Sequence, residues 1–266
     1  MSDAADSLLI HAVTGPLGPS TFQFEGRETT RYKLVAWRVI EGDRTALPEA
    51  IASGEPIAEP LSIRRLGGVD VRLEIQKAVD QNSVAAFRIG PPRRHEDGTW
   101  AAELIEAVGP VDDEALGTVA DERAKPVAFT DAALGTFTLN RAIGCFEGPA
   151  AWAGFDLTLN IETENADEAA AALREAKPVW DEPEKWKAAL GDAAADGLLE
   201  TFNDNWREED EGELTRDAFA ARLRPIFLTI EPDGGLTFEC DDDDLFGGHR
   251  VKVAGSVEDG LDEAYL

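Results

Sequence analysis

Residues 155–178 read FDLTLNIETENADEAAAALREAKP, and this stretch decides the fold of the second half of the chain. Apolar and polar residues alternate over residues 155–161, which predicts a strand with one buried face. Asn165 then caps a helix, with Glu168 three residues later in the capping-box arrangement, and Pro178 stops that helix. A strand followed directly by a capped helix predicts a domain in β-α-β order.

A second helical segment follows, with large or small apolar side chains at intervals of four. These are Trp186, Leu190, Ala194, Leu198, Phe202 and Trp206. Each interval advances about 400°, so the apolar stripe drifts by about 40° per step and leaves the core along a straight helix. We therefore expect a break at Gly191-Asp192, with Asp192 capping a second helix. A further helix starts at Thr215 and ends at Pro225.

Further strands complete a sheet in this half. The alternating segments are residues 135–141, 226–230, 236–240 and 249–253. Asp233-Gly234-Gly235 makes a tight turn between two of them, and Asp259-Gly260 turns into a last short strand. We expect the helices to pack on one face of an antiparallel sheet.

The first half of the chain is β-rich and contains one helix. Residues 31–39 are apolar on both phases, as in a central strand, whereas residues 69–76 alternate, which predicts a half-buried strand. Asp112 is the predicted N-cap of a helix that ends at Lys125-Pro126.

The two halves differ in composition, and we place the domain boundary near residue 130. This gives a β-rich N-terminal domain over residues 1–129 and an α+β domain over residues 130–266, so the fold class is α+β with two domains. Of the 266 residues, 53 are acidic and 25 are basic, and the net charge is −28. Residues 161–266 hold 29 acids and 10 bases, so the negative charge is concentrated in the second domain.

This charge excludes nucleic acid and anionic membranes as general partners, because both are polyanions. The first seven residues contain two acids and no base, so we expect no secretory signal and a cytoplasmic protein. Cys145 and Cys240 are expected to be buried free thiols. The three histidines are scattered and no Cys-x-x-Cys occurs, so no cofactor is predicted.

Four short motifs stand out in the second half: LGTFTLNR at residues 134–141, FEG at 146–148, NDNW at 203–206 and DDDDLFGGH at 241–249. In these motifs, residues 130–266 resemble the uncharacterised bacterial domain-of-unknown-function family 2262. VTG at residues 13–15 and RYKLVAWRV at residues 31–39 resemble the domain that often precedes it. The family pattern near the end is close to DDGDLFWGH, so Asp243 stands where the pattern has Gly, and Gly247 where it has Trp. The resemblance implies a fold and a bacterial, cytosolic setting, but no reaction.

The acidic run of residues 241–244 is the most conspicuous candidate site, because adjacent carboxylates repel one another or attract a cation. A calcium loop needs Gly at its sixth and Glu at its twelfth position, where this chain has Phe246 and Lys252. A solvated hairpin turn is the simplest interpretation. The alternatives are a divalent-cation site at Asp242 and Asp244, or a patch for a basic protein.

His249 lies in phase with Val251, so we expect it to be half-buried and hydrogen-bonded to a turn carboxylate such as Asp244. The alternative is a general base held by an acid. Phe246 lies between the acidic run and His249, and we take it with them as a candidate binding residue.

Two further polar groups are candidates for binding. Asn203, Asn205 and Trp206 lie at a helix end, where they serve as cap and packing residues or bind a polar group of a partner. Arg93-Arg94-His95 forms the basic tip of a long hairpin predicted for residues 85–107, and it is either solvated or docked on the acidic second domain.

No nucleophile-elbow, Walker or dinucleotide motif occurs, and no catalytic residue is assigned. We expect a non-enzymatic binding protein whose acidic C-terminal surface engages a basic protein, for example an immunity-type inhibitor of a basic toxin. One alternative is a metal-dependent hydrolase or transferase that uses Asp242, Asp244 and His249. Another is a small-molecule sensor with a pocket between the domains. The oligomeric state does not follow from the sequence.

Overall fold

The computed structural model describes residues 7–24, 26–96, 98–208 and 212–266. The chain divides into two compact units, Met1–Lys125 and Pro126–Leu266. The sequence predicts this boundary near residue 130. The expectation that no signal segment is present concerns mainly residues 1–6, which lie outside the described residues.

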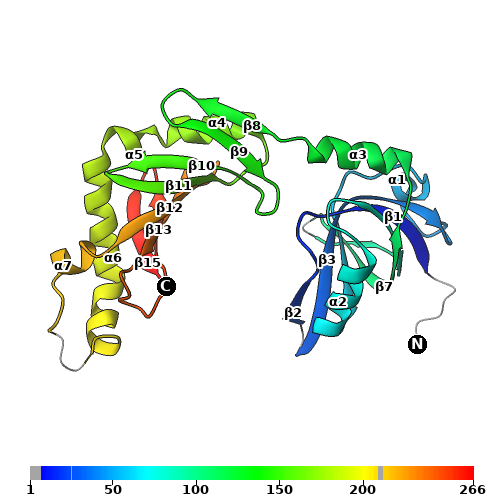
Figure 1. Ribbon diagram of the computed structural model, residues 1–266, viewed down its shortest axis with the longest axis horizontal. Helices are drawn as coiled ribbons and strands as arrows, with labels where there is room; N and C mark the ends of the chain where they lie inside the picture. The colour runs from blue at the N-terminus through cyan, green and yellow to red at the C-terminus, as the bar shows by residue number, and fades with distance from the viewer. Residues whose placement is uncertain (1–6, 25, 97, 209–211) are drawn as a thin grey trace. The chain divides into compact units, whose positions relative to one another are not determined.

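Seven strands of the described residues form the sheet of the first unit, and five of them close into a barrel (Figure 1). The strands are β1 (Leu8–Thr14), β2 (Ser20–Phe24), β3 (Arg27–Glu41), β4 (Leu61–Leu66), β5 (Val84–Ile89), β6 (Arg93–Arg94) and β7 (Trp100–Pro110). Their order is β1-β5-β7-β4-β3-β2, with β6 on β7, and a further pairing of β1 with β3 closes the ring. β4 and β7 are parallel, and the other pairs of described strands are antiparallel.

β3 serves two sides of the barrel, which explains why it is apolar on both phases. Its first half pairs with β2 and β4, and its second half pairs with β1. Tyr32, Leu34 and Trp37 are at most 1% exposed and fill the barrel. Val35 and Ala36 instead pack with residues of α3 (Glu114–Ala124) on the outside. The predicted central strand is confirmed.

The strand predicted for residues 69–76 is wrong, because these residues form α2 (Val69–Ala78). Val71 and Ile75 lie four residues apart on one side of the helix and pack into the barrel core. Val69 and Leu73, which a strand would bury with them, are 50% and 42% exposed. The segment fits both periods, and packing against the barrel selects the helix.

The other helices of the first unit are α1 (Glu49–Ala52) and α3, and α3 starts one residue later than predicted. Asp113, not Asp112, is its N-cap, because the Asp113 carboxylate accepts a hydrogen bond from the Leu116 amide at 3.2 Å. The helix ends before Lys125-Pro126, as predicted. The long hairpin is also confirmed, since β5 and β6 both pair antiparallel with β7.

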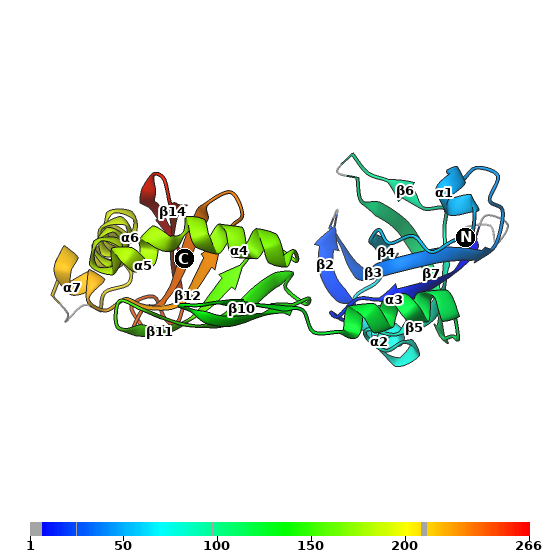
Figure 2. The ribbon, with the colours of Figure 1, turned by 90° about the horizontal axis from the view of Figure 1, so that it is seen from above.

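The second unit is a sheet with helices over one face (Figure 2). Its strands are β8 (Ala128–Asp131), β9 (Gly135–Asn140), β10 (Cys145–Trp152), β11 (Phe155–Ile161), β12 (Arg224–Ile230), β13 (Gly235–Asp241), β14 (Val251–Ser256) and β15 (Gly260–Tyr265). They neighbour one another in chain order, and α4 (Ala166–Glu175), α5 (Lys177–Asp181), α6 (Pro183–Asn205) and α7 (Arg216–Ala220) all come between β11 and β12. The broad α+β class is confirmed. The sheet differs from the expected antiparallel one in that β11 and β12 are parallel.

The predicted N-caps of two helices are confirmed, because each cap side chain bonds to backbone amides only a few residues away. Asn165 caps α4 by accepting from the Asp167 and Glu168 amides. The Glu168 carboxylate departs from the capping-box pattern, because it accepts from the Thr163 hydroxyl at 2.8 Å. Thr215 caps α7 as predicted.

The predicted break at Gly191-Asp192 is wrong, because α6 is one helix of 23 residues. Its drifting stripe meets different partners along its length. Gly191 faces Ala220 of α7 and Gly197 faces Ala264 of β15, where added Cβ atoms would approach the neighbours to 2.9 and 3.0 Å. A helix covered on several sides does not need one narrow apolar face.

Both cysteines are buried and free, as predicted. Burial and nearby carboxylates raise the pKa of the Cys145 thiol to about 11 and that of Cys240 to about 12, which keeps both thiols protonated and unreactive at neutral pH. None of the described helices is long and apolar enough to cross a membrane.

Candidate functional site

The acidic run of the sequence forms a turn built around the buried side chain of Asp242. This residue is 3% exposed. Its two carboxylate oxygens accept from the backbone amides of Asp244 at 3.2 Å and Phe246 at 2.6 Å. The carboxylate is thus occupied in shaping the turn, as short acidic side chains commonly are.

The turn reverses direction through two left-handed residues, Asp243 and Asp244, with φ of 51° and 65°. A glycine would adopt this backbone without strain, whereas Asp243 and Asp244 adopt it with a side chain. In this chain Asp243 instead accepts from Arg222 Nε at 3.0 Å. The reversal sends Leu245 and Phe246 into the core, where they are at most 3% exposed.

Three aromatic rings meet beside this turn. Phe246 is fully buried, and the ring of Trp206 lies edge-on to it with the centroids 5.6 Å apart. Trp206 follows the last residue of α6 and is 40% exposed. Its ring also meets that of His249 edge-on, at 5.9 Å. We call Trp206, Phe246, His249 and the turn of residues 241–244 the helix-end site.

The prediction for His249 is wrong in its surroundings. The side chain is exposed, and no described residue hydrogen-bonds its ring. Its backbone amide donates to the Phe246 carbonyl at 3.2 Å, so the residue closes the turn before β14 begins. Because Asp244 does not hold the imidazole, the geometry lacks the orienting acid that a general base needs.

The two asparagines of the helix end point to other partners. The Asn203 side chain pairs with the backbone of Leu214, accepting from its amide at 2.9 Å and donating to its carbonyl at 3.2 Å. Asn205 donates to the Thr201 carbonyl one turn back along α6. The structure thus brings Trp206, Phe246 and His249 together and leaves both asparagines in structural roles.

Exposed carboxylates occur both near Trp206 in the sequence and in the turn of residues 241–244. Asp204, Glu208 and Asp244 are exposed, and none of them forms an ion pair with a described residue. Within the described ranges, no three His, Cys, Asp or Glu side chains form a group that could hold a metal ion. The site offers an exposed aromatic surface next to a turn that carries exposed carboxylates.

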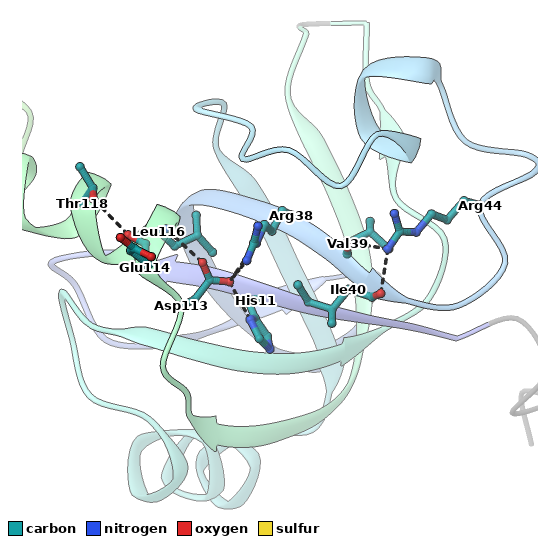
Figure 3. A network of polar contacts seen from close by, with 9 residues as sticks. All are labelled: His11, Arg38, Val39, Ile40, Arg44, Asp113, Glu114, Leu116 and Thr118. Carbon is teal, nitrogen blue, oxygen red and sulfur yellow. Dashed lines mark hydrogen bonds and ion pairs between the residues drawn. The ribbon is translucent and has the colours of Figure 1, made fainter.

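A second polar cluster lies in the first unit and was missed in the sequence. Figure 3 shows Asp113, at the start of α3, between His11 of β1 and Arg38 of β3. Its Oδ2 atom accepts from His11 Nδ1 at 2.8 Å, from Arg38 Nε at 2.9 Å and from Arg38 Nη2 at 2.8 Å. A carboxylate only accepts, so Nδ1 of His11 carries the proton. The sequence feature that pointed toward this cluster is the acidic N-cap of α3, which the sequence predicts at Asp112 and the structure has at Asp113.

The environment of Asp113 favours its charged form. Burial alone raises the pKa of this carboxyl, but the hydrogen bonds from His11, the Leu116 amide and Arg38 outweigh it and hold the pKa below its ordinary value. His11 has an orienting acid, yet no described hydroxyl or thiol is hydrogen-bonded to its ring. The cluster therefore joins α3 to two strands of the barrel and lacks a nucleophile.

A cleft of about 410 Å³ lies between α6, α7 and the ends of two strands. Lys187 lies over the Phe155 ring at 5.1 Å, and Arg216 pairs with Asp192 and Asp196 across the cleft. The hydrogen bond from Arg216 lowers the pKa of Asp196. Among the charged residues that line this cleft, Arg216 and Asp192 are therefore paired with each other.

The family described as "Uncharacterized protein conserved in bacteria (DUF2262)" matches residues 131–266, which confirms the resemblance found in the sequence. The matched residues lie within the second unit and include the helix-end site. No curated protein matches the chain.

Proposed function

The chain belongs to the bacterial family DUF2262, and from this premise we propose that its second unit is a non-enzymatic protein-binding module. The proposed contact surface is the helix-end site, and the proposed partner is a basic protein. An immunity-type inhibitor of a basic toxin is the concrete form of this proposal.

The exposure of Trp206 in a fixed position is the observation that carries the proposal. The residue is 40% exposed, while the edge-on contact of its ring with the buried Phe246 restrains it. Tryptophan is enriched among the residues that contribute most to binding, because a large rigid ring buries much area at little entropic cost. His249 extends the same aromatic surface.

The charge around this surface selects the class of partner. Residues 126–266 hold 32 acidic and 11 basic residues. Negative potential around an apolar anchor accelerates encounter with a positive surface and repels acidic proteins. Such steering weakens with ionic strength, so the complex should dissociate as salt is raised.

The test is affinity capture from the native host with the full chain as bait, comparing the wild type with Trp206→Ala. Tyr265→Ala is the matched control, because this residue is another exposed aromatic, at 41%, on β15. We expect one basic protein to bind the wild type and the Tyr265 variant, to elute with salt, and to be lost at least tenfold with Trp206→Ala. Equal retention by Trp206→Ala, or a partner with an acidic surface, would contradict the proposal.

A further inference from the structure

The barrel of the first unit carries a strip of positive charge on its outer side, although the chain as a whole is strongly acidic. Tyr32, Leu34 and Ile63 point into the barrel, so the residues that alternate with them point outward. We call the outward set the basic face: Arg27, Arg31 and Lys33 of β3, Arg64 of β4, Arg93 of β6, and Phe22 and Phe24 of β2. Figure 2 shows β6 and α3 on opposite sides of this unit.

The strand register concentrates these cations. Arg31 lies directly opposite Arg64 on the neighbouring strand. Like charges in directly opposed positions destabilise a sheet unless an anion lies between them. No described carboxylate forms an ion pair with any of the five basic residues of the face. Glu103 lies opposite Arg64 on β7, and Glu28 follows Arg27 in β3.

Aromatic rings alternate with the cations on the same face. The Arg31 guanidinium lies 5.4 Å from the centre of the Phe22 ring, and that of Arg64 lies 6.0 Å from the centre of the Phe24 ring. Phe24 is 47% exposed, so part of this side chain is accessible to a ligand. Flat apolar rings and guanidinium groups on one strip suit a ligand that has both flat rings and negative charges.

The face also holds polar atoms that have no protein partner. The Ser62 hydroxyl and Arg64 Nε are buried and make no hydrogen bond with a described residue. Arg64 borders a shallow hollow of about 590 Å³ that Arg94, His95, Glu96 and Thr99 of the hairpin complete. Arg94 is itself paired with Glu59 at 3.5 Å, so it contributes less free charge than Arg64.

We propose that the basic face binds single-stranded nucleic acid, with phosphates on the arginines and Lys33 and bases stacked on Phe22 and Phe24. Stacking on aromatic side chains combined with a cationic groove is how proteins hold single strands, whereas the bases of a duplex are hidden.

The topology of the barrel also agrees with the binding of single-stranded nucleic acid. A five-stranded barrel of the OB type binds oligonucleotides on its second and third strands and in the loops between strands one and two and strands four and five. In this barrel those strands are β3 and β4, and the loops carry β2 and β6.

The net charge of −28 led the sequence analysis to exclude nucleic acid. A net charge is a sum over the whole chain, but screening at physiological salt limits the reach of each charge to about 8 Å. Within that range the potential follows the local cations. The inference is independent of the proposed function, since it concerns the unit outside the family match.

The test measures fluorescence anisotropy of a labelled oligo(dT) of about 15 nucleotides with the full chain at about 50 mM salt. We expect saturable binding at micromolar concentration. Arg31→Glu combined with Lys33→Glu should weaken it at least tenfold, and Phe24→Ala about fivefold or more. The dependence on salt should become shallower by about 0.7 for each phosphate contact removed.

The control is Arg88→Glu, which makes the charge change of either single substitution at a barrel position outside the basic face. It should bind within about twofold of the wild type. Circular dichroism of each variant shows whether it is folded, so that weaker binding by a folded variant can be distinguished from unfolding. The proposal is wrong if no binding occurs at about 100 µM protein, if Arg88→Glu weakens binding as much as the double variant, or if a duplex binds as tightly as the single strand.

Discussion

Each unit buries one aspartate among its described residues, and the two carboxylates are satisfied in opposite ways. Asp113 of the first unit, 6% exposed, is held by His11 and Arg38, which lie 102 and 75 residues away in the chain. Asp242 of the second unit, 3% exposed, is held by backbone amides two and four residues ahead. The first carboxylate joins three elements, whereas the second shapes one turn.

This difference teaches which buried charges matter to a whole unit. A carboxylate that pairs with a distant cation, as Asp113 does with Arg38, can be lost only by leaving that cation without its matching charge. A carboxylate that accepts from its own turn affects mainly that turn, since backbone amides carry no net charge. The following predictions test this contrast, beginning with the largest effect.

Removing the Asp113 carboxylate with Asp113→Ala should lower the free energy of unfolding of the first unit by about 2–4 kcal/mol. The loss combines the N-cap of α3 with the partner of Arg38 and His11. Urea unfolding combined with hydrogen exchange of barrel peptides measures it for this unit. Asp112→Ala is the control and should stay within about 0.5 kcal/mol of the wild type, because Asp112 is not the cap. Equal effects of the two substitutions would contradict the conclusion that the Asp113 carboxylate stabilises the first unit through its distant partners.

Asp242→Ala should cost the second unit less, about 1–2 kcal/mol, because it leaves two backbone amides without their acceptor. Hydrogen exchange should show the change in residues 241–249 and leave the barrel unchanged. Millimolar Ca²⁺, Mg²⁺ or Mn²⁺ should not raise the melting temperature. If an ion stabilised the wild type but not Asp242→Ala, Asp242 would be a metal ligand and the contrast would fail.

The smallest effect is the pH dependence of the stability that Asp113 contributes. It distinguishes the contribution of the Asp113 charge from that of its hydrogen bonds. The pKa of Asp113 is lowered in the folded chain, so its stabilising contribution is fully present above the ordinary carboxyl pKa of about 4. That contribution is lost as the pH falls through the lowered folded value. The stability difference between wild type and Asp113→Asn in the first unit should therefore be constant from about pH 7 to 5 and shrink below about pH 4. A difference that stayed constant down to pH 2 would show that the charge contributes nothing.

Sequence patterns located most elements but failed where one pattern allowed two structures. Residues 69–76 alternate and also carry Val71 and Ile75 on one helical side, and the barrel core decided for the helix. The stripe of α6 predicted a break, which contacts with α7 and β15 made unnecessary. Both errors concern partners that lie far away in the chain. Periodicity describes one face of a segment and contains no information on how many faces will be covered.

The sequence predicted which residues belong to the candidate site, but it did not predict how their side chains are placed. The motif at residues 203–206 pointed to Trp206 and the motif at residues 241–249 pointed to Phe246 and His249, and the structure brings these three rings together. The motifs did not give the burial of Asp242 or the exposure of His249, because both depend on how the turn packs on α6.

The sequence by itself determined the caps at Asn165 and Thr215, the buried thiols, the family and the net charge, since each depends on neighbouring residues or on composition. Only the tertiary structure decided the partners of Asp113 and the gathering of cations on the barrel. Those follow from strand register and ring closure, which bring together residues tens of positions apart. Charge totals cannot show such clustering, because electrostatic interactions act over ångströms in space and not over distance along the chain.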